Sequence, residues 1–167
     1  MALSMFQVSI PVFVRGLRNM AGFLEKGRTD AETRKFAPEV LLVARLAPDM
    51  HCLSRQVQIA CDTVKNAGGR LAGIELPSFP DTETTFAELG ERIEKTIAFL
   101  EGIGEAQMEG SETRTIVLKF PGREMSFSGV EYLTGFVLPN FYFHTTTAYN
   151  LLRHNGVQIG KRDFIGA

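Results

Sequence analysis

The sequence is poor in residue types that mark several classes of protein. Among its 167 residues there are no tryptophans, two cysteines and three histidines. The cysteines, Cys52 and Cys61, lie on one predicted helix, which separates them by about 13 Å along its axis. That distance excludes a disulfide between them. Free thiols are typical of the cytoplasm, where we expect the protein to act.

An excess of charge of either sign is also missing. The 18 basic and 19 acidic side chains give a net charge of −1. Nucleic-acid-binding domains usually have a basic excess or stripe, so we expect no nucleic-acid partner. No apolar run approaches the roughly 20 residues of a membrane span, and the N-terminus lacks the features of a signal peptide. We therefore expect no membrane association either.

Apolar residues recur at helical spacing in four segments, which predicts four long helices. Their ranges are Ser4–Lys26, Pro38–Ala67, Thr84–Leu100 and Val130–His154. Pro11 and Pro139 should bend the first and the fourth helix, and Pro48 is a weak point in the second. The chain length suits one domain with a sizeable core.

A β-hairpin is predicted between the third and fourth helices. Within residues 114–129, Ile116, Leu118 and Phe120 alternate with other residues, and Pro121-Gly122 is a turn signal. Residues 157–167 are predicted to be irregular. This order predicts an all-α fold, namely a four-helix bundle with a small hairpin before the last helix, as a single domain over residues 1–167.

Polar side chains interrupt the apolar stripe of the second predicted helix. At about 100° per residue, Asp49 falls in the middle of the stripe, with Arg45 and Gln56 on its flank. His51 points to the opposite side. A carboxylate on an apolar stripe is costly unless it is paired. We therefore expect Asp49 to pair with Arg45, to be exposed where Pro48 breaks the helix, or to line an internal pocket.

The fourth predicted helix repeats this pattern. Asn140 and His144 fall on its apolar stripe, and Thr147 lies at the edge. Side chains four residues apart point the same way, so this pair is expected either to share a ligand or to hydrogen-bond within the core. His154 lies about 15 Å further along the axis and about 80° around it, so the two histidines cannot bind one metal.

The opposite side of the fourth helix carries Tyr142 and Tyr149 in an apolar strip. An exposed strip of this kind is a candidate subunit contact, which predicts a homodimer. The alternative is that the C-terminal tail packs against it.

The element order resembles that of the DinB/YfiT-like superfamily of four-helix bundles. The stretches that carry the resemblance are "MFQVSIPVFVRGL", "ARLAPDM", "PNFYFHTTTAYNLLRHNG" and "GKRDF". More closely, nearly the whole chain is similar to one of the superfamily's branches of unknown function. The resemblance implies a DinB-like bundle. Many members bind a divalent metal through three histidines, one on the second helix and two in an HxxxH on the fourth, and some are thiol transferases.

The chain departs from this metal site at two positions. The HxxxH register falls on Asn140 and His144, and the histidine of the second helix falls on Arg45, so only His144 has the expected type. An arginine offers a metal no lone pair. His144 with Asp49 and Asn140 could form only a weak mixed site. We therefore expect no metal cofactor, with zinc or nickel bound at His144 as the alternative.

Three functions are compatible with these residues. The first is binding of an unknown small ligand in a polar pocket within the bundle, lined by Arg45, Asp49, Gln56, Asn140, His144 and Thr147. The second is a metal-dependent enzyme, a hydrolase or a thiol-dependent transferase, in which His144 is the general acid or base beside Asp49. No nucleophile motif supports an enzyme. The third is a structural dimer whose polar cluster is only a core network.

Overall fold

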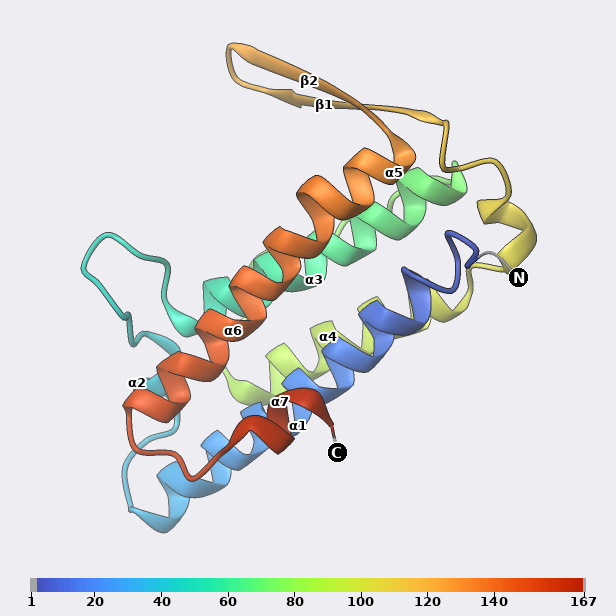
Figure 1. Cartoon of the computed structure of the whole chain (residues 1–167). Coiled ribbons are helices and arrows are strands. Elements are labelled where there is room, and N and C mark those ends of the chain that lie inside the picture. The colour runs from blue at the N-terminus through green and yellow to red at the C-terminus, as the bar shows by residue number, and fades with distance from the viewer. Residues whose placement is uncertain (1–2, 167) are drawn as a thin grey trace.

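The computed structural model describes residues 3–166, and four long helices dominate it (Figure 1). They are α1 (Ile10–Thr33), α3 (Leu53–Ala72), α4 (Phe86–Glu101) and α6 (Leu138–His154). Helix α1 packs on α4, α4 on α3 and α3 on α6, and α6 returns to contact α1. The predicted four-helix bundle is confirmed.

Short elements connect the long helices. In chain order they are α2 (Glu39–Leu42), the 3-10 helix η1 (Glu105–Met108), β1 (Thr115–Phe120), β2 (Arg123–Ser128), α5 (Gly129–Glu131), the π-helix η2 (Tyr132–Val137) and α7 (Lys161–Ile165). Helix α7 packs on α1. The predicted irregular tail thus contains a short helix, which Asp163 begins by accepting a hydrogen bond from the Gly160 N–H at 2.7 Å.

The two strands form the predicted antiparallel hairpin. Thr115 is opposite Ser128 at its open end, and Phe120 is opposite Arg123 at the turn. Gly122 has a φ of 71°, a conformation that favours glycine, so the Pro121-Gly122 turn signal is confirmed. In Figure 1 the hairpin extends away from the bundle beside the start of the last helix.

The first helix is shifted relative to its prediction. It begins at Ile10, so Pro11 lies in its first turn, where an N–H would have no partner within the helix. The predicted bend at Pro11 is therefore wrong, since the proline begins the helix instead of interrupting it. The helix also continues to Thr33, beyond the predicted end at Lys26.

The second predicted helix is two elements joined by an irregular segment. Helix α2 ends at Leu42, and α3 begins only after Cys52, whose backbone is extended with a ψ of 168°. Pro48 lies in the segment between them, where its missing N–H and its ring oppose a helix. The prediction of one helix over Pro38–Ala67 is wrong, because the whole segment 43–52 around Pro48 is not helical.

Helix α3 also continues past its predicted end. Gly68 and Gly69 lie inside it because close packing needs them. A Cβ at Gly68 would lie 2.7 Å from the Leu100 side chain, and one at Gly69 would lie 2.3 Å from that of Leu76. The helix ends instead at Gly73, which has a φ of 69°.

The third and fourth helices lie where the sequence predicts them. Thr85 caps α4 in a capping box with Glu88. The fourth helix is built from α5, η2 and α6 in succession, and Pro139 falls in the first turn of α6. Pro139 was predicted to bend the helix, and the π-helical stretch η2 ends directly before the turn that contains this proline.

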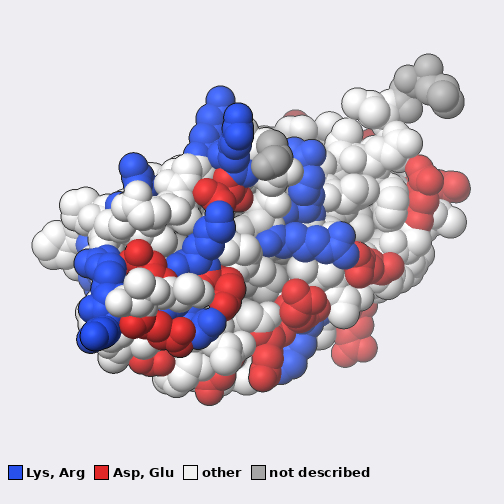
Figure 2. Space-filling view, turned by 90° about the horizontal axis from the view of Figure 1, so that it is seen from below, with Lys and Arg blue, Asp and Glu red and all other residues white. Residues whose placement is uncertain are grey.

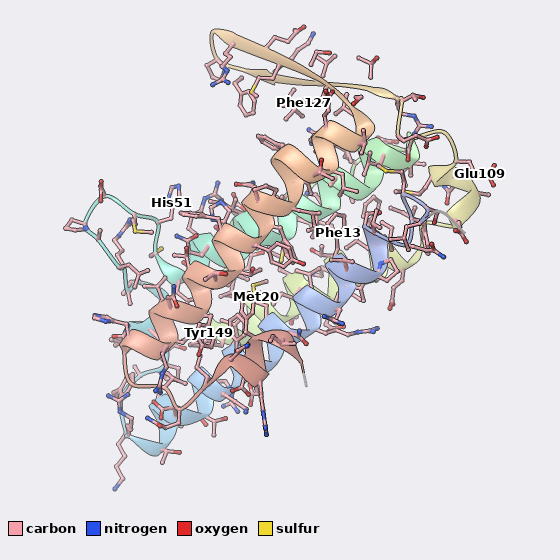
Figure 3. The ribbon with its side chains drawn as sticks, viewed as in Figure 1. Phe13, Met20, His51, Glu109, Phe127 and Tyr149 are labelled. Carbon is pink, nitrogen blue, oxygen red and sulfur yellow. The ribbon has the colours of Figure 1, made fainter. Side chains whose placement is uncertain are left out.

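The core runs the length of the bundle. Figure 3 labels Phe13 and Met20 on α1, both fully buried. The ring of Phe13 meets that of Phe141 edge-on, with centroids 6.0 Å apart. Gly16 allows α6 this close, because a Cβ there would lie 2.7 Å from the Phe141 ring.

Candidate functional site

Two predicted site residues do not reach the core. Arg45 and Asp49 lie in the irregular segment before α3, and both are exposed. The guanidinium of Arg45 donates to the backbone carbonyl of Met50, and within residues 3–166 no hydrogen bond or ion pair joins it to Asp49. The expectation that both side chains face the core is wrong, because it requires a helix through Pro48. Of the three alternatives for Asp49, exposure at the break is the one observed.

The other predicted residues meet where α3 and α6 pack against each other. The imidazole Nδ1 of His144 lies 2.6 Å from the Gln56 Oε1, and Asn140 Nδ2 donates to the Thr63 Oγ1 at 2.9 Å. We call these four residues the polar seam. Gln56 and His144 are buried, whereas Asn140 and Thr63 are half-buried. Of the predicted site residues, Gln56 and His144 are thus in direct contact, whereas Asn140 bonds Thr63.

Hydrogen bonding fixes the orientation and tautomer of the His144 ring. Gln56 donates its Nε2 to the carbonyl of His51 at 3.0 Å, which leaves Oε1 to face the imidazole. An amide oxygen only accepts, so Nδ1 carries the proton. Figure 3 marks His51 at the end of the loop that precedes α3. The Nε2 of His144 has no hydrogen-bond partner among residues 3–166 and keeps its lone pair.

The surroundings of His144 keep its ring neutral. Burial, with smaller electrostatic contributions from the neighbouring His51 and Arg55, lowers the pKa of His144 from 6.5 to about 4. At neutral pH the residue is therefore an uncharged imidazole. Thr147 is buried one turn further along α6, where its hydroxyl donates to the Phe143 carbonyl at 2.7 Å. His154 is exposed at the end of the helix, as expected.

A pocket adjoins the polar seam at Thr63. It has a volume of about 260 Å³ and lies between α3, the hairpin and the helical turns before α6. Its walls are formed by Arg55, Ile59, Asp62, Thr63, Asn66, Arg70, Leu118, Lys119, Phe120, Tyr132 and Phe136. We call it the α3–hairpin pocket. The residues from α3 recur at helical spacing, which places them on one face of that helix.

Ion pairs occupy the neighbouring face of α3. Arg92 of α4 has a side chain only 1% exposed, and its Nη1 lies 2.9 Å from Glu83. Its Nη2 lies 3.0 Å from Asp62 and 2.9 Å from Asp81, in ionic contact without hydrogen-bonding geometry. Lys65 also pairs with Asp62, at 2.9 Å. These charges fasten the loop 74–85 to α3 and α4.

Sequence reasoning missed Thr63 and the Arg92 cluster. Thr63 follows Gln56 by seven residues, a spacing that returns to the same face of a helix, so this position could have been found. Arg92 could not, because its partners Asp81 and Glu83 lie in a loop with no periodicity to place them.

The histidine-based metal site of the superfamily does not fit these residues. Among the residues that the structure describes, no group of three or more His, Cys, Asp or Glu side chains could hold a metal ion. In the HxxxH register, Asn140 uses its amide nitrogen to donate to Thr63, and His144 is the single imidazole. Arg45, in the third position, is exposed and bonded to its own loop.

The two predicted interface tyrosines have different surroundings. Tyr149 packs edge-on between Phe23 of α1 and Phe164 of α7, with centroid distances of 6.0 and 5.9 Å. The alternative of tail packing therefore applies to Tyr149, which Figure 3 labels beside α7. Tyr142 is 43% exposed, and its neighbour Phe143 is 55% exposed.

The surface carries charges of both signs. Figure 2 shows acidic and basic side chains close together on the face that it presents. None of the helices within residues 3–166 is long and apolar enough to cross a membrane.

Comparisons with known proteins agree with the fold and the resemblance. The model of the DUF1993 family, a domain of unknown function, matches residues 5–165. A crystal structure of a DinB family member from Shewanella denitrificans is similar to this chain, with 41% sequence identity and a TM-score of 0.91. The similarity covers 98% of this chain and 92% of that one. None of the curated proteins matches. With its bundle, its hairpin and a family match over nearly its whole length, the chain belongs to the DUF1993 family of DinB-like domains of unknown function.

Proposed function

We propose that this protein binds a small molecule in the α3–hairpin pocket, beside a degenerate metal site. One observation carries the proposal: Thr63 both lines the pocket and accepts the hydrogen bond from Asn140. The position that carries a metal-binding histidine in relatives is thus linked to a pocket wall. Small-molecule sites combine apolar or aromatic walls with polar groups that fix the ligand's orientation, and this pocket is lined by residues of both kinds.

The polar seam joins α3, which forms one wall of the pocket, to α6, which follows the η2 turns that form another. The bond between His144 and Gln56 joins α6 to the start of α3, and the bond between Asn140 and Thr63 joins them again beside the pocket. Thr147 has no part in it, because its hydroxyl bonds only to its own helix. Arg45 and Asp49 have no part in the proposal, because both are exposed in the loop before α3.

A fragment screen read by amide NMR tests this proposal. We expect binding fragments to shift signals of Thr63, Asn66 and Tyr132, which lie in the pocket. Thr63→Val keeps the side-chain shape but removes the hydroxyl, so it should weaken binding. Thr146→Val is the matched control, since Thr146 is exposed on α6. Fragments that shift only signals elsewhere, or equal losses in both variants, would refute the proposal.

The alternative is a metal-dependent enzyme that uses His144 with zinc or nickel. The free lone pair on Nε2 is the observation in its favour. This function has less support, because Asp49, its expected partner, is exposed in the loop before α3. A thiol-dependent reaction at Cys61 is also disfavoured, since burial raises the pKa of its thiol to about 12 and makes it a poor nucleophile. Metal analysis of protein purified without an affinity tag discriminates: stoichiometric metal that is lost in His144→Ala would favour the enzyme.

We further propose that the protein is a cytoplasmic homodimer. Both cysteines are free, which suits a reducing compartment. From Tyr132 to Leu152 the chain has no acidic residue, lysine or arginine, and the exposed Tyr142 and Phe143 lie within this run. Interface cores are depleted of charge and enriched in such aromatic residues.

A further inference from the structure

The α3–hairpin pocket contains one cation without an opposite charge. Arg70 is half-buried in the pocket wall and forms no ion pair with any residue in the range 3–166. The other charged side chains of the wall are compensated. Asp62 contacts Lys65 and Arg92, Arg55 contacts Asp81, and Lys119 lies 3.8 Å from Glu124. The surplus charge of the pocket is therefore positive and is located at Arg70.

Two hydroxyl groups of the pocket have a proton left to donate. The Oη of Tyr132 accepts a hydrogen bond from the Arg70 Nη1 at 3.0 Å. Burial raises the pKa of Tyr132, so this hydroxyl stays protonated. Thr63 accepts from Asn140 in the same way. Neither hydroxyl proton has an acceptor among the described residues, so the pocket offers donors from Arg70, Tyr132 and Thr63 together.

An aromatic cluster forms one side of the pocket, in which Tyr132 is fully buried behind the half-buried Phe136. The rings of Tyr132 and Phe136 are stacked, with centroids 5.9 Å apart and planes inclined by 16°. Phe127 of β2 contacts both, at 6.1 and 5.9 Å, and so fastens the hairpin beside them. Figure 3 shows Phe127 between the hairpin and the start of the last helix. A planar apolar group can pack against such a wall.

We infer that the α3–hairpin pocket binds a small carboxylate attached to a flat apolar body. This inference rests on the proposed function, and it adds the chemical class of the ligand. The guanidinium of Arg70 matches a carboxylate in charge and geometry. The hydroxyls of Tyr132 and Thr63 supply further donors, and the stacked rings take the apolar part. The volume of about 260 Å³ limits that part to roughly a single ring.

Three probes of nearly identical shape test the charge preference. Benzoate, benzamide and benzamidine share one planar ring and differ in charge, which is negative, zero and positive. We expect benzoate to bind most tightly, by about tenfold over benzamide, the difference made by a charge-assisted hydrogen bond. Benzamidine should bind most weakly. Calorimetric titration gives the affinities, and amide NMR shifts of Thr63, Asn66 and Arg70 locate the site.

Two variants and a control assign the preference to Arg70. Arg70→Gln should weaken benzoate binding about tenfold and leave benzamide binding nearly unchanged. Tyr132→Phe keeps the ring and removes one donor, so it should weaken benzoate binding less. Arg15→Gln is the matched control, because Arg15 is an exposed arginine on α1. The NMR spectrum of each variant shows directly whether it is folded.

The outcomes separate this inference from the proposed function. Equal binding of benzoate and benzamide in the pocket would overturn the carboxylate preference and leave small-molecule binding intact. Loss of benzoate binding in Arg15→Gln but not in Arg70→Gln would place the anion site elsewhere and overturn the inference. If neither the probes at millimolar concentration nor any screened fragment shifts the pocket signals, both proposals fail.

Discussion

At the scale of single residues, the surroundings of His144 change the chemistry of its ring. The residue is 8% exposed, and its ring is hydrogen-bonded to Gln56, whose amide donates to the His51 carbonyl. The neutral ring is thus built into the contact between two helices. Protonating it would place a charge in a buried site already close to His51 and Arg55.

The free energy of unfolding should therefore decrease as the pH falls below 6.5, the pKa of an ordinary histidine. In the unfolded chain His144 takes up a proton near pH 6.5, but in the folded protein only near pH 4. Between these values the unfolded state binds more protons, so acidification lowers the free energy of unfolding, by up to about 3 kcal/mol in total. Urea unfolding at a series of pH values measures this loss.

His144→Gln is the control for that measurement. Glutamine does not titrate, so the variant should lose less stability than the wild type between about pH 7 and pH 5. The carboxylates and the exposed histidines are unchanged in it. Equal slopes in the two proteins, or a His144 ring that titrates near pH 6.5 by NMR, would show that burial does not hold the ring neutral.

At the scale of elements, two helical glycines differ in the space available for a side chain. A Cβ at Gly129, the first residue of α5, would lie 1.8 Å from the backbone oxygen of Ser111. A Cβ at Gly22, inside α1, would meet nothing within 4 Å. The first glycine allows the hairpin to join the last helix close to the segment before β1, whereas the second is not required by packing.

Alanine at these positions should change stability with opposite signs. Gly129→Ala forces backbone to move and should cost about 2 kcal/mol or more. Gly22→Ala reduces the backbone entropy that is lost on folding, so it should add about 0.5–1 kcal/mol to the free energy of unfolding. Thermal unfolding followed by circular dichroism gives both values. A neutral Gly129→Ala would mean that the junction at Ser111 is loose.

Periodicity predicted the elements with apolar stripes and failed where proline chemistry decides. The apolar stripe of α6 correctly placed Asn140 and His144 against α3. The predicted direction of Gln56 was also correct, because Gln56 lies within α3, after the non-helical segment around Pro48. Arg45 and Asp49 lie before α3 begins. Their predicted directions assumed a continuous helix through Pro48, which the structure does not have. Helical spacing from Gln56 could also have predicted the position of Thr63, whereas it could not predict Asp81 and Glu83, the loop partners of Arg92.

At the scale of the whole molecule, the outer side of α6 should form the proposed dimer contact. In ultracentrifugation we expect a particle of twice the chain mass of 18.5 kDa. Replacing Tyr142 and Phe143 together by serine should shift the mass toward that of the monomer. Val117→Ser is the matched control, since Val117 is similarly exposed on the hairpin at 42%. A wild-type mass of one chain at all concentrations would exclude the dimer.

The π-helical stretch η2 sets the phase of α6 about its own axis. A π-turn spans one residue more than an α-turn, and each residue corresponds to about 100° of rotation. Deleting one residue within Tyr132–Val137 would leave Tyr132 beside Arg70 but turn Asn140 and His144 away from Thr63 and Gln56. The extra residue therefore acts as an insertion. It allows Tyr132, before the π-turn, and Asn140 and His144, after it, to contact the same face of α3.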